Sequence, residues 1–271
     1  MGKISEENTA KEIIAEYINI LGNFCGKRDI KSLTRAELAT KYKLAKADVM
    51  VLFGGSIMVG GDVLAQAIKN GIAKKYIIVG GIGHTTEKLR QKIHERYPAI
   101  MTAGLPEAAI FTEYLRYKYN MQPDFLETES TNCGNNITYL LKLLAKEKIK
   151  FNNIIITQDA TMQYRMEAVL RKYANSLEII NFAAHHVSVI VKQGELVFAE
   201  EVPGMWSMQE YITLLMGEIV RLADTKDGYG PAGKNYIIHV AIPAEVQNAF
   251  DELKKFYGTM IRKAEKRYAS K

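Results

Sequence analysis

A chain of 271 residues, 48% of them hydrophobic, is long enough to bury one large core, or a core with a smaller lobe beside it. The net charge of +6 does not point to nucleic acid, because residues 251–271 alone carry seven Lys and Arg against three Asp and Glu, which is typical of a solvated basic helix. No apolar stretch is long enough to cross a membrane and no signal-peptide core follows the N-terminus, so we expect a cytoplasmic protein with no nucleic-acid partner and no membrane span.

The first part of the chain predicts a helix followed by a strand, a helix and a second strand. Residues 9–24 carry apolar side chains at helical spacing. Two continuous apolar runs, 49–53 and 76–79, predict strands that are buried on both faces. Between them a helix presents one apolar face, formed by Val63, Leu64, Ala67 and Ile68. Together the two strands and this helix make a βαβ unit.

Strands and helices continue to alternate after this unit. Further strands are predicted at 124–127, 153–157 and 177–182, and further helices at 89–96, 107–118, 135–146 and 162–173. This alternation predicts an α/β fold in which a mainly parallel sheet is covered by helices on both faces.

The C-terminal part of the chain departs from the alternation. A helix is predicted at 208–222, a glycine-rich turn at 227–233, a strand at 236–240 and a long helix after it. We therefore expect an N-terminal helical segment (1–45) that packs on the core, the α/β core itself (46–200), and a mainly helical C-terminal lobe (201–271). Trp206 and Tyr211 are expected to form the apolar face of this lobe, which would cover the core as a lid.

Ligands of open α/β sheets bind beyond the carboxyl ends of the strands, so the residues after each predicted strand are candidates for the site. Gly54, Gly55 and Ser56 follow the first strand, and Gly80, Gly81, Gly83 and His84 follow the second. Glycines at these places would let a ligand approach backbone N–H groups, although paired glycines also occur in plain turns between strand and helix. Neither run is a G-x-G-x-x-G fingerprint, so we do not expect NAD.

The residues after the third and fourth predicted strands are polar. They are Thr131, Asn132 and Asn135, then Gln158, Asp159, Thr161 and Arg165. The first three precede a helix, where Asn and Thr are ordinary N-caps, and only one of Asn132 and Asn135 can be the cap. Asp159 and Arg165 have opposite charges, which could hold the ammonium and carboxylate groups of a ligand or could pair with each other.

Several side chains are candidates for catalysis, and each has a structural alternative. His84 could be a general acid or base, or a polar loop side chain. Glu107 lies in the first turn of a predicted helix, where the dipole alone favours a carboxylate. Cys133 lies at a helix N-terminus, but no histidine and carboxylate follow at a recognisable distance, which favours a packed thiol. His185 and His186 are adjacent and point to opposite faces of an extended chain, so we expect no metal site.

Four segments resemble motifs of a known family. They are Gly80-Gly81-Ile82-Gly83-His84-Thr85, Ser130-Thr131-Asn132-Cys133-Gly134-Asn135-Asn136, Gln158 to Arg165, and Asp227-Gly228-Tyr229-Gly230-Pro231. In this order, and over nearly the whole chain, they are similar to the YdcF-like family of uncharacterised bacterial domains, which also includes SanA and ElyC. The resemblance implies a Rossmann-like α/β/α sandwich with a helical C-terminal lobe over a deep cleft, and it implies binding of S-adenosylmethionine. It implies no reaction, and it makes Glu107 a candidate cleft residue. SanA and ElyC carry an N-terminal membrane anchor that this sequence lacks, which argues against an envelope role.

From the residues and the resemblance together, we expect a small-molecule ligand: S-adenosylmethionine or a related adenosyl compound. The expected contacts are Gly54, Gly55, Ser56, Gly80, Gly81, Gly83, Thr131, Asn132, Asn135, Gln158, Arg165 and Tyr229. Tyr229 would stack on the adenine, and the candidate catalytic groups are His84, Glu107 and Asp159. An S-adenosylmethionine-dependent transferase is one form of this hypothesis. One alternative is a hydrolase or transferase of a phosphorylated substrate, such as an envelope precursor, with the glycine amides as an anion cradle. Another is a non-enzymatic sensor whose lid moves when the ligand binds.

Overall fold

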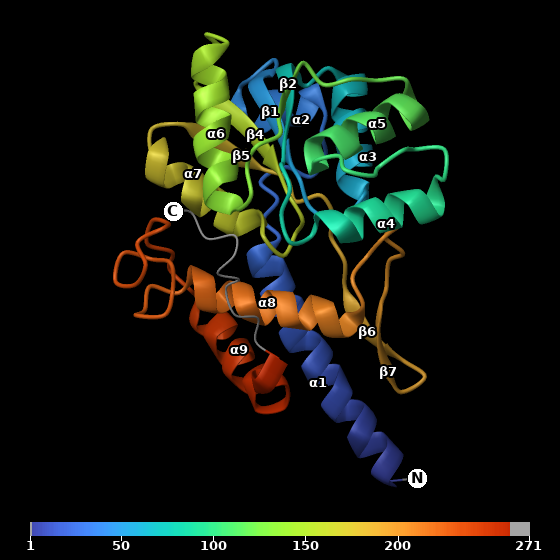
Figure 1. Cartoon of the computed structure of the whole chain (residues 1–271). Coiled ribbons are helices and arrows are strands. Elements are labelled where there is room, and N and C mark those ends of the chain that lie inside the picture. The colour runs from blue at the N-terminus through green and yellow to red at the C-terminus, as the bar shows by residue number, and fades with distance from the viewer. Residues whose placement is uncertain (1, 261–271) are drawn as a thin grey trace.

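A computed structural model describes residues 2–260 of the chain (Figure 1). Its centre is a sheet of five parallel strands in the order β3-β2-β1-β4-β5. The strands are β1 (Ala47–Phe53), β2 (Ala73–Val79), β3 (Phe125–Glu127), β4 (Asn153–Thr157) and β5 (Glu178–Asn181). The chain moves outward from β1 through β2 to β3 and then returns to the other side of β1, so its direction reverses between β1 and β4. This is the order of a Rossmann-like sheet, and the predicted α/β fold is confirmed.

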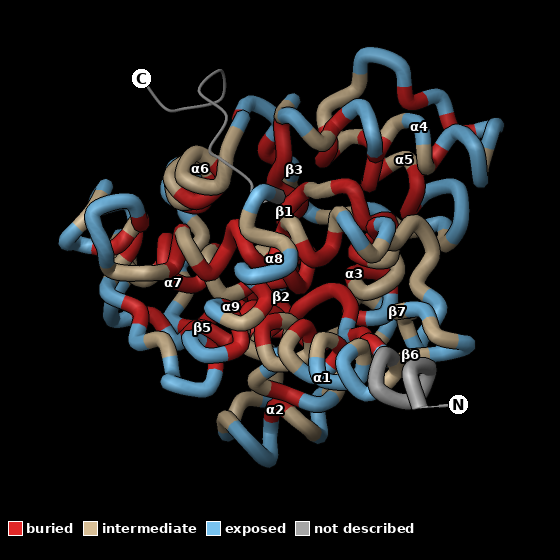
Figure 2. The backbone as a smooth tube through the Cα atoms, turned by 90° about the horizontal axis from the view of Figure 1, so that it is seen from below, coloured by how far each residue is buried: buried red, intermediate tan, exposed pale blue. Residues whose placement is uncertain are grey.

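Helices cover both faces of the sheet because successive side chains of its central strands point to opposite sides. In β1, Val49, Val51 and Phe53 belong to one hydrophobic core, and Met50 and Leu52 belong to the other. The first core includes α6 (Cys133–Lys146) and α7 (Gln163–Tyr173). The second includes α2 (Arg35–Tyr42), α3 (Val59–Asn70), α4 (Thr86–Arg96) and α5 (Glu107–Tyr119). Figure 2 shows the buried residues concentrated along the central strands and on the helix faces turned toward them.

A second layer lies at the carboxyl edge of the sheet, below it in Figure 1. It contains α1 (Gly2–Cys25), a hairpin of β6 (Val189–Lys192) and β7 (Glu195–Phe198), α8 (Met208–Leu222), α9 (Ala244–Tyr257) and the short 3-10 helix η1 (Gly258–Met260). The first helix packs against α8, α9 and β6, so the two ends of the chain build this lobe together. None of the helices in the described part of the chain is long and apolar enough to cross a membrane.

Most predicted elements are present, with bounds shifted by a few residues. Elements that were not predicted include α2, which Thr34 caps by accepting a hydrogen bond from the Glu37 N–H, and the two strands of the β6-β7 hairpin. The predicted strand at 236–240 is wrong. That segment is irregular, because its backbone bonds go to Tyr229 and Ala168 rather than to a neighbouring strand. The predicted C-terminal helix is α9, and residues 261–271, which hold most of its expected basic side chains, lie outside the described residues.

Candidate functional site

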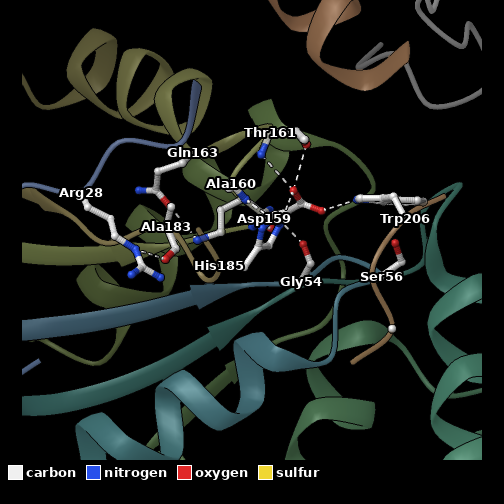
Figure 3. Close-up of polar contacts among 12 residues, drawn as sticks. Arg28, Gly54, Ser56, Asp159, Ala160, Thr161, Gln163, Ala183, His185 and Trp206 are labelled. Atoms are coloured by element: carbon white, nitrogen blue, oxygen red, sulfur yellow. Dashed lines mark hydrogen bonds and ion pairs between the residues drawn. The ribbon is translucent and has the colours of Figure 1, made fainter. Parts of the chain in front are cut away.

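The two strands at which the chain direction reverses end in the candidate site (Figure 3). Gly54, Gly55 and Ser56 follow β1, and Gln158 and Asp159 follow β4. The Gln158 side chain joins the two strand ends by donating from Nε2 to the Gly54 carbonyl over 2.9 Å. Reversal points of this kind leave a crevice in which α/β proteins bind ligands. We call the region formed by residues 54–56 and 158–161 the β1–β4 crevice.

A chain of hydrogen bonds fixes the orientation of Gln158. Its backbone N–H donates to Gln163 Oε1 over 2.8 Å, and Gln163 Nε2 donates to Asn181 Oδ1 over 2.9 Å. Asn181 Nδ2 in turn donates to Asp29 Oδ2 over 2.8 Å. The end of β4 is therefore connected through α7 and β5 to the loop that follows α1.

Asp159 is the charged centre of the crevice. Its side chain is buried, with the residue 6% exposed. Oδ1 accepts hydrogen bonds of 2.9 Å from the backbone and the hydroxyl of Thr161 and lies 3.3 Å from Nε2 of His185. Oδ2 accepts a 2.8 Å bond from the indole N–H of Trp206. Burial alone would raise the pKa of Asp159, but the hydrogen bond and charge of His185, with Thr161 and Trp206, hold it at about 2.

A cavity of about 320 Å³ lies beside the crevice, between the start of α4 and the first half of α8. Its walls include His84, Thr85 and Lys88 on the α4 side and Trp206, Glu210 and Thr213 on the α8 side. Pockets for small molecules have volumes of roughly 300–1,000 Å³, and this one lies at the lower end of that range. Trp206 belongs to both regions, because its ring lines the cavity while its N–H bonds Asp159.

The starts of α4 and α8 place opposite charges in the cavity wall, Lys88 and Glu210. Ser207 and Glu210 form a capping box, in which the Ser207 hydroxyl accepts from the Glu210 N–H and Glu210 Oε2 accepts from the Ser207 N–H. The other carboxylate oxygen of Glu210 lies 2.5 Å from Lys88 Nζ. The Lys88 hydrogen bond is the main cause that lowers the pKa of Glu210 to about 2, with the Ser207 bonds adding to it. The ammonium groups of Lys88 and Lys92 also lie 5.4 and 4.7 Å from the centre of the Trp206 ring.

The glycines after β1 and β2 have an internal explanation. A Cβ at Gly54 would lie 2.5 Å from Oε2 of Glu107, and one at Gly80 would lie 3.1 Å from the Glu107 Cβ. A Cβ at Gly81 would lie 2.2 Å from the Ser130 carbonyl oxygen. The space beside these three glycines is therefore filled by the protein itself. Gly55 and Gly83 are less crowded, with nearest atoms at 3.2 and 3.3 Å.

The amides of these loops are also used within the protein. The Gly54 N–H donates to the Val79 carbonyl over 2.7 Å and the Gly80 N–H to the Glu127 carbonyl over 2.9 Å. The amides of Gly81 and Gly83 donate to the hydroxyls of Ser130 and Thr86, over 3.3 and 2.8 Å. An anion in a cradle made of these four amides would have to displace the present acceptors.

Glu107 connects the loop after β2 to α5. Its N–H donates to the Gly81 carbonyl over 3.0 Å, and its Oε1 accepts from the hydroxyls of Thr85 and Thr86 over 3.0 and 2.9 Å. Burial raises the pKa of Glu107 above its ordinary value of 4.5, although the Thr86 and Thr85 bonds act against this. We call the region formed by residues 54, 80, 81 and 107 the β1–β2 bracket.

The segment 130–136 pairs largely with itself. Asn132 is the N-cap of α6, and its Oδ1 accepts from the Asn135 N–H over 2.9 Å. Its Nδ2 donates to Asn135 Oδ1 over 2.7 Å, and the Thr131 hydroxyl donates to the same oxygen over 3.3 Å. As expected, only one of the two asparagines caps the helix. Cys133 is the first residue of α6 and is half-buried.

Arg165 and Tyr229 lie away from the cavity walls. Arg165 pairs with Glu218 of α8, with Nε to Oε2 at 2.5 Å and Nη2 to Oε1 at 3.0 Å. It does not pair with Asp159, so that alternative is wrong. Tyr229 meets Tyr236 edge-on, with ring centres 5.2 Å apart. Adenine stacking on Tyr229 therefore stays a prediction.

The site residues that were not predicted include His185, Lys88 and Glu210. His185 comes from the loop after β5 and is buried against Asp159, while the adjacent His186 is exposed, as the alternation of an extended chain predicts. The spacing of Ser207 and Glu210 was a readable capping signal, and it would have placed Glu210 at the start of α8. No local pattern announces the contact of His185 with Asp159, because it depends on how two loops pack.

Two buried polar atoms of the site have no hydrogen-bond partner within residues 2–260. They are Ser56 Oγ and His185 Nδ1; the other two such side-chain atoms belong to Glu127 and Thr157. Unpaired buried polar atoms are rare in folded proteins, because each costs desolvation energy without a compensating bond. Ser56 and His185 can therefore each accept one more polar partner.

Comparison with known proteins identifies no family for this chain. None of the protein-family models matches it. A crystal structure of the tRNA N6-threonylcarbamoyladenosine dehydratase TcdA of E. coli is similar at 14% sequence identity, with a TM-score of 0.31, over 84% of this chain and 95% of that one. A functional assignment thus depends on the geometry and chemistry of the site itself.

Proposed function

We propose that the protein binds S-adenosylmethionine, or a related adenosyl ligand, in the cavity between α4 and α8 and in the adjoining β1–β4 crevice. The observation that carries the proposal is the chemistry of the cavity wall. An aromatic ring, a cation and a carboxylate, from Trp206, Lys88 and Glu210, meet around about 320 Å³ at the edge of the sheet where ligands bind.

This set of groups corresponds to the parts of the ligand. Adenine is flat and aromatic, which suits the Trp206 ring and the apolar side chain of Leu214. Ribose hydroxyls suit the amide of Gln209 and the hydroxyl of Thr213. The amino-acid part carries both signs of charge and needs partners of both signs, which Lys88, Glu210 and Asp159 supply. The resemblance to the YdcF-like family supports the same ligand. The proposal is one of binding and assigns no reaction.

Trp206 makes the proposal directly testable, because it is the single tryptophan of the chain. We expect its fluorescence to change, with saturation, when S-adenosylmethionine, S-adenosylhomocysteine or adenosine is added, and to stay constant with inorganic phosphate. Thr213→Arg, which places a large side chain in the cavity, should abolish the fluorescence change. Thr225→Arg, at an exposed position in the loop after α8, is the matched control and should preserve it.

The alternatives give different outcomes. A response to inorganic phosphate and none to any adenosyl compound would overturn the proposal and favour a phosphorylated substrate. Mass spectrometry of small molecules released from the purified protein tests the same point without a choice of ligand. Binding of S-adenosylmethionine with no turnover under any acceptor tried would favour the sensor over the transferase.

A further inference from the structure

Trp206 lies beside two buried polar groups, the carboxylate of Asp159 and the hydroxyl of Ser56 (Figure 3). Its N–H occupies Oδ2 of Asp159 at 2.8 Å, and Ser56, which is 1% exposed, lies next to it with an unpaired hydroxyl. Figure 3 shows Ser56 beside the indole, with its hydroxyl turned to the side on which Trp206 lies. Lys92 confirms that these segments are neighbours, because its Nζ reaches the carbonyls of both Ser56 and Gly204, at 3.4 and 2.6 Å.

The two polar groups beside Trp206 would both be satisfied by a donor that carries positive charge. Asp159 is ionised and can only accept hydrogen bonds, and the Ser56 hydroxyl can accept as well as donate. Lys92 does not meet this need, because its amino group is directed to the two carbonyls. His185 lies on the other oxygen of Asp159, Oδ1, and leaves Oδ2 to Trp206. The single indole N–H of Trp206 bonds only Asp159, whereas a charged donor with several N–H bonds could bond both Asp159 and Ser56.

The segment that carries Trp206 can move without unwinding a helix. Residues 201–207 are irregular and lie between β7 and α8. A positive φ of 74° at Gly204 makes the turn against Met58. The segment is held by the Lys92 bond to Gly204 and by a 3.0 Å bond from the Met205 N–H to the Val202 carbonyl. A backbone rotation at this turn is the movement by which the indole would leave Asp159.

We propose that Asp159 and Ser56 form a binding subsite for a primary ammonium group, which replaces the indole N–H on Asp159 and gives the Ser56 hydroxyl its missing partner. The subsite rests on the proposed function, in which the group would be the α-ammonium of the adenosyl ligand. A sulfonium centre has no N–H to offer to Ser56 and Asp159, so the ammonium end of such a ligand is the part that enters.

Two matched nucleosides test the subsite. One is 5′-(3-aminopropylthio)-5′-deoxyadenosine, and the other is its 5′-butylthio analogue, in which a methyl group replaces the ammonium. Isothermal titration calorimetry should give the ammonium compound a dissociation constant lower by roughly tenfold or more, the range expected for hydrogen bonds to a charged group. In Asp159→Asn the two dissociation constants should become nearly equal.

Two further variants keep the test decisive if Asp159→Asn folds poorly. Ser56→Ala should reduce the ratio of the two dissociation constants by several-fold. Trp206→Phe keeps a ring but has no N–H to displace, so it should increase the ratio. A merely structural role for Trp206 would leave the ratio unchanged. Thr157→Val also removes a buried, unpaired hydroxyl, from inside β4, and as the control it should leave the ratio at its wild-type value.

Failure of this inference differs from failure of the proposed function. If both nucleosides bind equally well to the wild type, the adenosyl ligand stands and the ammonium subsite is overturned. The ammonium subsite is also overturned if Ser56→Ala and Trp206→Phe leave the ratio of the two dissociation constants unchanged. Ser56 would then make no bond to the ammonium group. If neither nucleoside binds, the proposed function itself fails.

Discussion

The two halves of the carboxyl edge of the sheet differ in how completely their polar groups are paired. In the β1–β2 bracket, the amides of Gly54, Gly80 and Gly81 are bonded, and Glu107 fills the space beside the glycines. In the β1–β4 crevice, Ser56 has an unpaired hydroxyl, and Oδ2 of Asp159 accepts a bond from Trp206, which the proposed ligand would displace. A region whose polar groups are all paired needs no further partner, whereas a charged region with unpaired atoms can bind another polar group. The space beside Gly54, Gly80 and Gly81 is thus taken by the protein itself, and the cavity adjoins both regions, the bracket through Thr85 and the crevice through Trp206.

The largest expected effect is in the bracket, at Gly81. Gly81→Val would place Cβ 2.2 Å from the Ser130 carbonyl oxygen, and backbone cannot withdraw as a flexible side chain can. We expect the free energy of unfolding to fall by about 3 kcal/mol or more, measured by chemical denaturation. Gly83→Ala is the control, because its nearest atom would be at 3.3 Å and the change should be about 1 kcal/mol or less. A Gly81→Val protein of normal stability would show that the bracket is open to a ligand after all.

The next effect concerns Asp159, whose contribution depends on pH. Because folding lowers the pKa of this carboxyl from 3.8 to about 2, its stabilisation is present above 3.8 and is lost as the pH falls through about 2. Asp159→Asn should therefore lower the free energy of unfolding by about 2 kcal/mol at neutral pH, and the difference from wild type should shrink in acid. A difference that does not vary with pH would mean that the carboxylate is not held in its ionised form.

Glu107 should show the opposite dependence on pH. Folding raises its pKa above 4.5, so its stabilisation is fully present below 4.5 and is lost as the pH rises through the raised value. Glu107→Gln keeps an oxygen for Thr85 and Thr86 and does not titrate. Denaturation from acidic to neutral pH should show the wild type losing stability relative to this variant. Equal slopes for the two proteins would remove the contrast between the bracket and the crevice.

The smallest expected effect has the opposite sign to most substitutions. Ser56→Ala removes a buried hydroxyl that has no partner, so we expect the unliganded protein to gain about 1 kcal/mol in free energy of unfolding. Thr157→Val should behave alike in this respect, since its hydroxyl is also unpaired. Thermal denaturation without ligand checks both. A loss of stability in Ser56→Ala would show that the hydroxyl is paired in solution and that the crevice is as complete as the bracket.

The fold could be predicted from the sequence because its signals are local. Continuous apolar runs located β1, β2 and β4, and the alternation with helices indicated the parallel order of the sheet. The β6-β7 hairpin was missed because its turn, Gln193-Gly194, lacks the usual Asn or Asp, although both residues take a positive φ. The run at 236–240 is apolar enough for a strand, but a strand also needs a neighbouring strand to pair with. Whether one is present cannot be read from a few residues of sequence.

The site was less predictable, for a physical reason. A glycine after a strand shows that a Cβ is absent but not what occupies the space, and at Gly54 the occupant is Glu107 from a distant helix. The position of Asp159 at the end of β4 was readable, because it follows directly from the strand before it. Its partners His185 and Trp206 come from loops far along the chain, so their meeting depends on packing of the second layer, which sequence periodicity does not report.

The partnership of the two chain ends in the second layer has a consequence for biosynthesis. Ile18 and Leu21 of α1 are fully buried, and part of what covers them is α8, which begins at Met208. Synthesis proceeds at about 5–20 residues per second, so roughly 10 to 40 seconds pass between the synthesis of α1 and that of α8. During this time the nascent chain carries an amphipathic helix without its native neighbours. The lobe that bears the cavity is accordingly the last part to close, and translation must reach α8 and α9 before the first helix can settle.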